Sequence, residues 1–99
     1  MLFDVQVTTR DSAEVISVIG DVDLATLPRM AAALDGATAE VVEVDLRSVD
    51  WFDPLCLGVL IAADLRVRRR GGALVVRADG QVADMLAESR VDTVLTVQV

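Results

Sequence analysis

The residues best suited to chemistry lie together in the segment Asp53-Pro54-Leu55-Cys56. It places a carboxylate three residues before the only cysteine of the chain. A thiol in the first turn of a helix can ionise and act as a redox sensor. Here the nearby carboxylate opposes thiolate formation, no basic residue is close in sequence, and free cysteine is among the most buried residue types. We therefore expect a buried Cys56, with redox sensing as the alternative.

Composition argues against catalysis. The chain has no histidine, so it can build neither a Ser/His/Asp nor a Cys/His constellation. The usual ligands for zinc or copper are missing too, and only carboxylates remain for a hard cation. No glycine-rich phosphate loop is present. The sequence predicts a binding protein rather than an enzyme, with no catalytic residue, metal or cofactor.

Charge narrows the class of partner. The net charge is −7 and the chain has no lysine, so it repels phosphate backbones overall. The one basic cluster, Arg66 to Arg70, falls at the end of a predicted helix, where the helix dipole favours cations. We interpret it as a solvated helix end, and we expect a protein partner rather than a nucleic acid.

Length and hydropathy indicate one domain over residues 1–99. The longest apolar run, Leu55 to Ala63, is far shorter than the roughly 18 to 20 residues of a membrane span, so no membrane insertion is expected. The N-terminus has no basic region before an apolar stretch, which argues against a secretory signal. A cytoplasmic location is the resulting expectation, and a single cysteine agrees with it.

The segment Asp53-Pro54-Leu55-Cys56 is predicted to open a helix that positions its side chains. Asp53 is a good N-cap and Pro54 fits the first helical position, so a helix is predicted over Leu55–Arg70, stopped by Gly71-Gly72. Two faces of this helix are apolar. The predicted buried stripe consists of Leu57, Leu60, Ile61 and Leu65. The neighbouring face, a candidate partner surface, consists of Leu55, Gly58, Val59 and Ala62.

The other elements alternate between strands and helices. Period-2 and β-branched patterns predict strands over residues 3–8, 15–19, 41–46, 73–77 and 93–99. Gly20-Asp21-Val22-Asp23 is expected to break the second strand, and an acidic loop to follow the third. Helices are predicted over residues 26–34, capped by Thr26 or Asp23, and from Asp79-Gly80 onward. The order ββαβαβαβ implies an α/β domain: a mixed, mostly parallel sheet with an antiparallel N-terminal hairpin and helices packed on it.

Four segments in this order resemble the STAS family, the domain shared by bacterial anti-sigma factor antagonists and the tails of sulfate transporters. Gly20-Asp21-Val22-Asp23 is similar to the family's Gly-Glu-Leu-Asp turn and Val44-Asp45-Leu46 to its Val-Asp-Leu strand. The segment from Asp53 to Leu60 is similar to Asp-Ser-Ser-Gly-Leu-Gly-Val-Leu, and Arg69-Arg70-Gly71-Gly72 to the basic helix end and glycine pair. The resemblance covers nearly the whole chain and implies the STAS fold.

The resemblance also implies a function. Such an antagonist binds an anti-sigma factor that is also a serine kinase, frees a sigma factor, and is switched off when the second serine of the turn is phosphorylated. That serine falls on Leu55 here, the first serine on Pro54 and the glycine on Cys56. The chain is therefore expected to bind a kinase-type anti-sigma factor without carrying the phosphate signal at the family site. The implied partner surface consists of Asp21, Asp23, Asp53, Pro54, Leu55, Cys56, Gly58, Val59 and Ala62.

Several alternatives stay open. Asp21 and Asp23 could serve only the turn, and Leu55 could fill the core instead of anchoring a partner. Trp51 and Phe52 are expected to be core residues rather than binding residues. Ser48, Thr26 and Ser12 are the substitute phosphate acceptors. The alternative function is a small cytosolic STAS subunit that binds the ATPase of a lipid or anion transporter.

Overall fold

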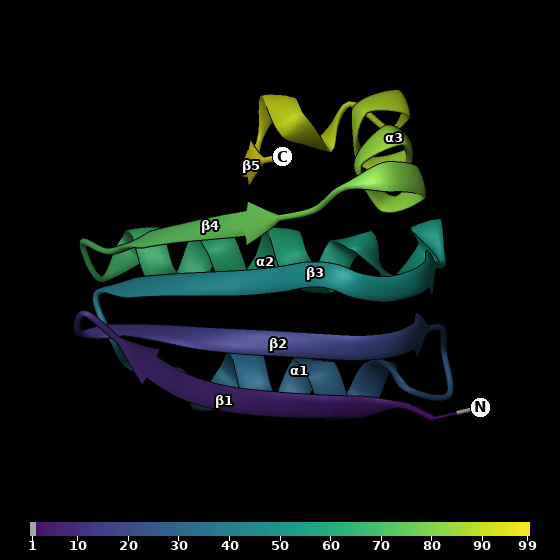
Figure 1. The fold of residues 1–99 in the computed structure, drawn as a ribbon. Helices are drawn as coiled ribbons and strands as arrows, with labels where there is room; N and C mark the ends of the chain where they lie inside the picture. The colour runs from purple at the N-terminus through teal and green to yellow at the C-terminus, as the bar shows by residue number, and fades with distance from the viewer. Residues whose placement is uncertain (1) are drawn as a thin grey trace.

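The computed structural model describes residues 2–99 as one α/β domain built on a five-stranded sheet (Figure 1). Its elements follow the predicted order ββαβαβαβ, with two short 3₁₀ turns added. The strands are β1 Asp4–Arg10, β2 Ala13–Val22, β3 Val41–Phe52, β4 Ala73–Arg77 and β5 Thr96–Gln98. The helices are α1 Leu27–Gly36, α2 Leu57–Arg69 and α3 Gly80–Glu88, and the 3₁₀ turns are η1 Pro54–Cys56 and η2 Val91–Thr93.

The sheet runs in the order β1-β2-β3-β4-β5. β1 and β2 pair antiparallel, and every later neighbour pairs parallel. This arrangement confirms the mixed sheet with an antiparallel start. Because the parallel strands all point the same way, the carboxyl ends of β2 and β3 meet at one edge of the domain, where Asp21 pairs with Trp51 and Val22 with Phe52.

The core lies between the sheet and helices α1 and α2, which cover the same sheet face (Figure 1), and Val82 and Leu86 of α3 also belong to it. Alternate residues of the central strands point into it, as the period of a strand requires. The fully buried strand residues are Ile16, Val18, Val22, Val42, Val44, Leu46, Leu74 and Val76. Met30 and Leu34 of α1, four residues apart on one helix face, pack against them.

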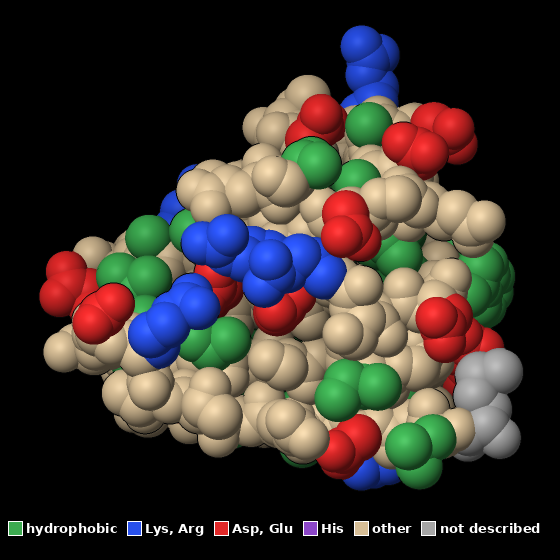
Figure 2. All heavy atoms as spheres, in the orientation of Figure 1, with side chains coloured by type: hydrophobic (Ala, Val, Ile, Leu, Met, Phe, Trp, Pro, Cys, Tyr) green, Lys and Arg blue, Asp and Glu red, His purple; other side chains and the backbone are tan. Residues whose placement is uncertain are grey.

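The opposite sheet face carries charged pairs instead of a second helical layer. Glu43 of β3 is buried there between Arg10 of β1 and Arg77 of β4, and forms an ion pair with each. Beside them, Arg47 donates to the Asp45 carboxylate, which holds the Asp45 pKa below its ordinary value. Figure 2 shows the basic side chains as a row across this face. The arginine stems thus cover a sheet face that has no helix over it.

Two strands extend further than predicted. β2 continues through Gly20 to Val22, and β3 continues through the expected acidic loop to Phe52. Register irregularities between Ser17 and Ile19 and between Gly20 and Asp21 allow the two strands to stay paired. The predicted break and the predicted loop were therefore wrong: the polar residues there lie on a twisted strand pair.

Helix α2 begins two residues later than predicted and buries a different stripe. After the 3₁₀ turn η1 it runs from Leu57 to Arg69, and Gly71 follows with φ +84°, the expected left-handed stop. Leu57 and Leu60 are buried, whereas Ile61 and Leu65 are exposed, which corrects the predicted stripe. The buried positions continue instead as Ala63, Asp64 and Val67.

The buried stripe of α2 contains a carboxylate, Asp64, so a hydrophobicity pattern could not predict that stripe. Asp64 pairs with Arg68 one turn later, at 2.9 Å between carboxylate oxygen and Nε. The rest of the basic cluster is the solvated helix end that was predicted: Arg66 pairs with Asp35, and Arg70 donates to the Ala39 carbonyl. Among the described residues, no helix has the length and apolar character needed to cross a membrane.

Both edge strands differ from the sequence expectation. β1 is mostly exposed, and Val7, one of the alternating apolar residues from which this strand was predicted, is open to solvent. The final strand covers only Thr96–Gln98, because η2 takes the residues where it was predicted to start. An edge strand has one neighbour and less cover than a central strand, so alternation alone overestimates its burial.

Gly20→Ala is expected to destabilise the domain by at least about 2 kcal/mol. Gly20 has φ +101°, and an added Cβ would lie 2.3 Å from the carbonyl oxygen of Leu2. Gly36→Ala is the matched control, because no atom lies within 4 Å of its added Cβ. Urea unfolding measures both variants. If Gly20→Ala and Gly36→Ala had the same free energy of unfolding, the backbone at position 20 would not require glycine.

Candidate functional site

The candidate site is the edge where β2 and β3 end and α2 begins. Asp53 fixes this junction by two hydrogen bonds. Its backbone N–H donates to the Val22 carbonyl at 2.8 Å, and its carboxylate accepts from the Leu55 N–H at 3.0 Å. The predicted N-cap role of Asp53 is confirmed, and Pro54 occupies the first position of the turn that follows. The start of α2 is therefore held against the end of β2.

Asp23 holds the neighbouring loop. Its carboxylate accepts from the N–H groups of Ala25 and Thr26, while the Thr26 hydroxyl accepts from the Asp23 N–H and donates to the Asp21 carbonyl. These reciprocal bonds form a capping arrangement at the start of α1. The turn role considered for Asp23 is confirmed, and the turn places Asp21 and Asp23 on the same edge as Asp53.

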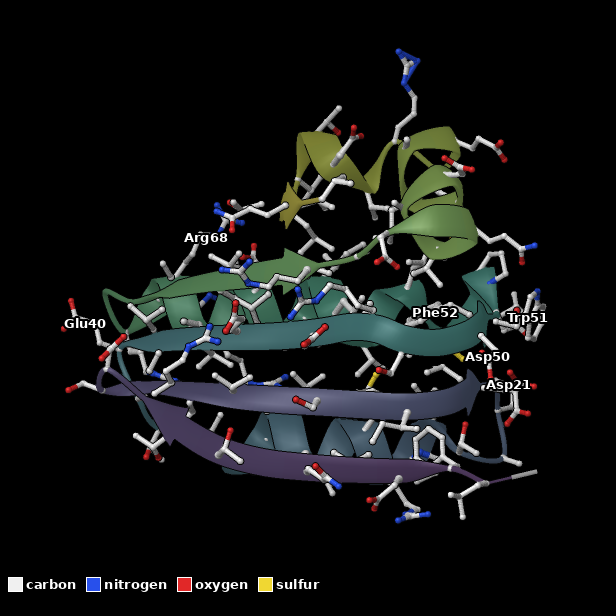
Figure 3. The ribbon with its side chains drawn as sticks, in the orientation of Figure 1. Asp21, Glu40, Asp50, Trp51, Phe52 and Arg68 are labelled. Atoms are coloured by element: carbon white, nitrogen blue, oxygen red, sulfur yellow. The ribbon has the colours of Figure 1, made fainter. Side chains whose placement is uncertain are left out.

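The side chains at this edge differ sharply in exposure. Leu55 is 76% exposed, so the prediction that it reaches the surface is confirmed and the core-filler alternative is wrong. Phe52 is buried as predicted, but Trp51 is 48% exposed, which corrects its assignment to the core. Figure 3 shows Trp51 projecting from the end of β3, close to Asp50 and Asp21.

The predicted partner face continues along the first turns of α2. Gly58 and Ala62 are exposed and Val59 is partly exposed, so with Pro54 and Leu55 they are accessible at the helix start. Leu24, in the loop before α1, adds another exposed apolar side chain, at 62%. Sequence reasoning missed Leu24, because a single leucine in a polar loop carries no periodicity.

Cys56 does not belong to this surface. Its thiol is fully buried in the core, so the side chain has no area to offer a partner. Burial raises the thiol pKa above its ordinary value, and the nearby charges of Asp53 and Asp23 raise it further. The prediction that Cys56 contacts a partner is corrected, and the expectation of a buried cysteine is confirmed.

The Cys56 thiol is expected to resist the disulfide reagent DTNB at pH 7.5 and to react only as the chain unfolds. A buried thiol with a raised pKa is protonated at that pH, and the thiol is the unreactive form. The raised pKa also makes the free energy of unfolding depend on pH. As the pH rises, the Cys56 thiol ionises in the unfolded chain before it ionises in the folded one. Its contribution to stability is therefore complete below the ordinary thiol pKa and is lost as the pH rises through the folded pKa. Rapid labelling of the native protein at pH 7.5 would support redox sensing.

The substitute phosphate acceptors lie in different settings. Thr26 is partly buried and its hydroxyl is engaged in the capping loop. Ser12 sits in the β1–β2 turn with φ +70°, at the opposite end of the sheet from Leu55. Ser48 is exposed on β3. None of the three lies in the helix-start segment from Asp53 to Ala63, which has no side-chain hydroxyl.

A family profile described as "Mlab, STAS domain" matches residues 5–97, nearly the whole chain. The chain belongs to the STAS family. The resemblance read from the four sequence segments is thereby confirmed. No curated protein matches this STAS domain significantly.

Solved structures share the fold of this STAS domain. An anti-sigma factor antagonist from Mycobacterium paratuberculosis superposes with a TM-score of 0.89 at 20% identity, covering 97% of this chain and 85% of the other. The Bacillus cell fate determinant SpoIIAA in its phosphorylated form gives 0.71 at 11% identity, with 99% and 92% covered. A sulfate transporter family protein from Wolinella succinogenes gives 0.72 at 16% identity, with 88% and 75% covered. At these identities the likeness concerns the fold.

Proposed function

We propose that this STAS domain is an anti-sigma factor antagonist-like binding module that sequesters a kinase-type anti-sigma factor and so releases a sigma factor. The observation that carries the proposal is the exposed Leu55 at a rigidly capped helix start. An apolar side chain that is 76% exposed contributes little to the fold, and its burial in a complex is worth about 1.5 to 3 kcal/mol. We infer that the start of α2 is the centre of the interface.

The capped geometry supports this role. The carboxylates of Asp53 and Asp23 accept hydrogen bonds from backbone N–H groups. These bonds fix the start of α2 and the loop before α1 in the free protein. A rigid surface loses less conformational entropy on binding than a flexible one. The site is therefore proposed to be preorganised, and Asp21, Asp23, Asp53, Pro54, Leu55, Gly58, Val59 and Ala62 are its proposed contact residues.

The family position of the phosphorylated serine is occupied by Leu55, so the proposed module cannot be switched off there. Phosphate at a helix start would add about −1.5 to −2 charges beside Asp53 and disrupt a desolvated contact. Without that hydroxyl, binding is proposed to depend on the abundance of the chain and of its competitors rather than on ATP.

A displacement assay tests the proposal. Each serine-kinase-type anti-sigma factor encoded in the source genome is purified in complex with its sigma factor, and the STAS domain is added in increasing amounts. The proposal expects one complex to lose its sigma factor in proportion to the added domain, by size-exclusion chromatography. Retention of every sigma factor at saturating domain would refute it.

The alternative is a subunit that binds the ATPase of a lipid or anion transporter. The observation that favours it is the missing hydroxyl from Asp53 to Ala63, because a subunit that holds its ATPase permanently needs no phosphate switch. A tagged STAS domain separates the two hypotheses. Co-purification with a transporter ATPase and no anti-sigma factor supports the alternative.

A further inference from the structure

Trp51 is exposed because of its position on β3. Successive residues of a strand point to opposite faces, and Phe52 occupies the core, so Trp51 must point outward. Its register partner on β2 is Asp21, whereas Phe52 pairs with buried Val22. The half-exposed tryptophan thus lies at the edge that also carries Leu55.

A hollow lies beside Trp51, between the end of β3 and α3. Its volume is about 200 Å³, and it is lined by five apolar or aromatic residues, Trp51, Phe52, Pro54, Val82 and Met85, and by two polar ones, Asp50 and Gln81. Pockets for drug-sized ligands and cofactors are roughly 300 to 1,000 Å³. A smaller hollow with mostly apolar and aromatic lining suits one side chain of a partner protein.

Acidic side chains dominate this edge. Asp21, Asp23, Asp50 and Asp53 lie there with Trp51 and Leu55, and no arginine of residues 2–99 forms an ion pair with any of the four. Arg29 borders the edge, where it lies over the Phe3 ring, and it pairs with Asp4 instead. Figure 2 shows acidic and hydrophobic side chains together along the right-hand margin, away from the basic row. Such a surface repels a phosphate backbone or an anionic membrane and attracts a basic protein surface.

We propose that Trp51 and the hollow against α3 form a second anchor of the partner interface, beside Leu55. The occupant is a protein surface that inserts one apolar side chain between Trp51 and Met85 and surrounds it with lysine or arginine residues facing the four aspartates. This inference rests on the proposed function and extends the interface from the start of α2 to α3. Paired aromatic and apolar anchors with a polar rim are typical of binding hot spots.

The test measures binding of the STAS domain to the purified anti-sigma factor that the displacement assay selects. Trp51→Ala is expected to weaken the Kd by at least about 30-fold, and Gln81→Arg, which adds a positive charge to the rim, by at least about tenfold. Asp50→Asn is expected to slow association and flatten its dependence on salt. Val41→Ala and Asp11→Asn, both at the opposite end of the sheet, are the matched controls and should change nothing.

Thermal unfolding of each variant confirms that it is folded. If Leu55→Asp abolishes binding while Trp51→Ala and Gln81→Arg leave the Kd unchanged, the second anchor is refuted and the proposed function stands. If the anti-sigma factor binds and its association rate does not depend on salt concentration, the proposal that the partner presents a basic surface is refuted. If no anti-sigma factor binds the unaltered domain, the proposed function fails and this inference fails with it.

Discussion

Leu55→Asp is expected to abolish partner binding while leaving the domain folded. Leu55 is 76% exposed in the free protein, so a carboxylate at this position costs the fold little. In the complex the same carboxylate would enter a desolvated apolar contact, at a cost of about 2 to 4 kcal/mol, or roughly 30- to 1,000-fold in Kd. Titration calorimetry with the selected anti-sigma factor measures the loss.

Leu65→Asp is the matched control. Leu65 is another exposed leucine, at 41%, but it lies in α2 near the basic end of the helix, away from the proposed interface. It should bind as the unaltered domain does. Loss of the thermal transition in Leu55→Asp, or normal binding by a folded Leu55→Asp, would contradict the anchor role.

Restoring serines at Pro54 and Leu55 is expected to create a phosphorylation site. Asp53 and the helix behind it already present this turn, and in Pro54→Ser/Leu55→Ser the missing hydroxyls are supplied. Cys56 is left unchanged because it is fully buried, and glycine there would leave a cavity in the core. With Mg-ATP and the selected kinase, intact mass should show one phosphoryl group per chain.

The phosphorylated double variant should bind its partner at least about tenfold more weakly than the unphosphorylated form, a difference of about 1.4 kcal/mol. The physical reason is the added charge of about −1.5 to −2 next to Asp53 and Asp23. Pro54→Ala/Leu55→Ala, which carries neither hydroxyl, is the control and should take no phosphate. A double variant that folds and binds the kinase but stays unmodified would show that the family switch requires more than these two serines.

Local chemistry explains what the sequence could predict of the fold. The Asp53-Pro54 cap, the Gly71 stop and the β-branched runs of β2, β3 and β4 depend on neighbouring residues, and all are confirmed. The ends of β2 and β3 were wrong because the irregular register that keeps them paired depends on two segments distant in sequence. The stripe of α2 was wrong because the buried face includes a carboxylate, Asp64, which no hydrophobicity pattern selects, while Ile61 and Leu65 turn to the surface.

The candidate site was predictable to a similar degree. The family pattern located Asp23, Asp53 and Leu55, and the structure places them at one edge. The exposure of Trp51 could have been found from the sequence, since two adjacent strand residues cannot both face the same core. The hollow beside it could not, because α3 reaches the end of β3 only through tertiary packing. The burial of Glu43 between Arg10 and Arg77 could not be predicted either, because the two arginines lie on other strands, far from Glu43 in sequence.

Independence from phosphate is tested most directly by the affinity of the STAS domain for its anti-sigma factor before and after incubation with Mg-ATP and that kinase. We expect the same Kd in both measurements, release of the sigma factor in both, and an unchanged intact mass, because residues 53–63 offer no hydroxyl. A phosphoryl group mapped to Ser48, Thr26 or Ser12 together with a weakened Kd would contradict a phosphate-independent antagonist.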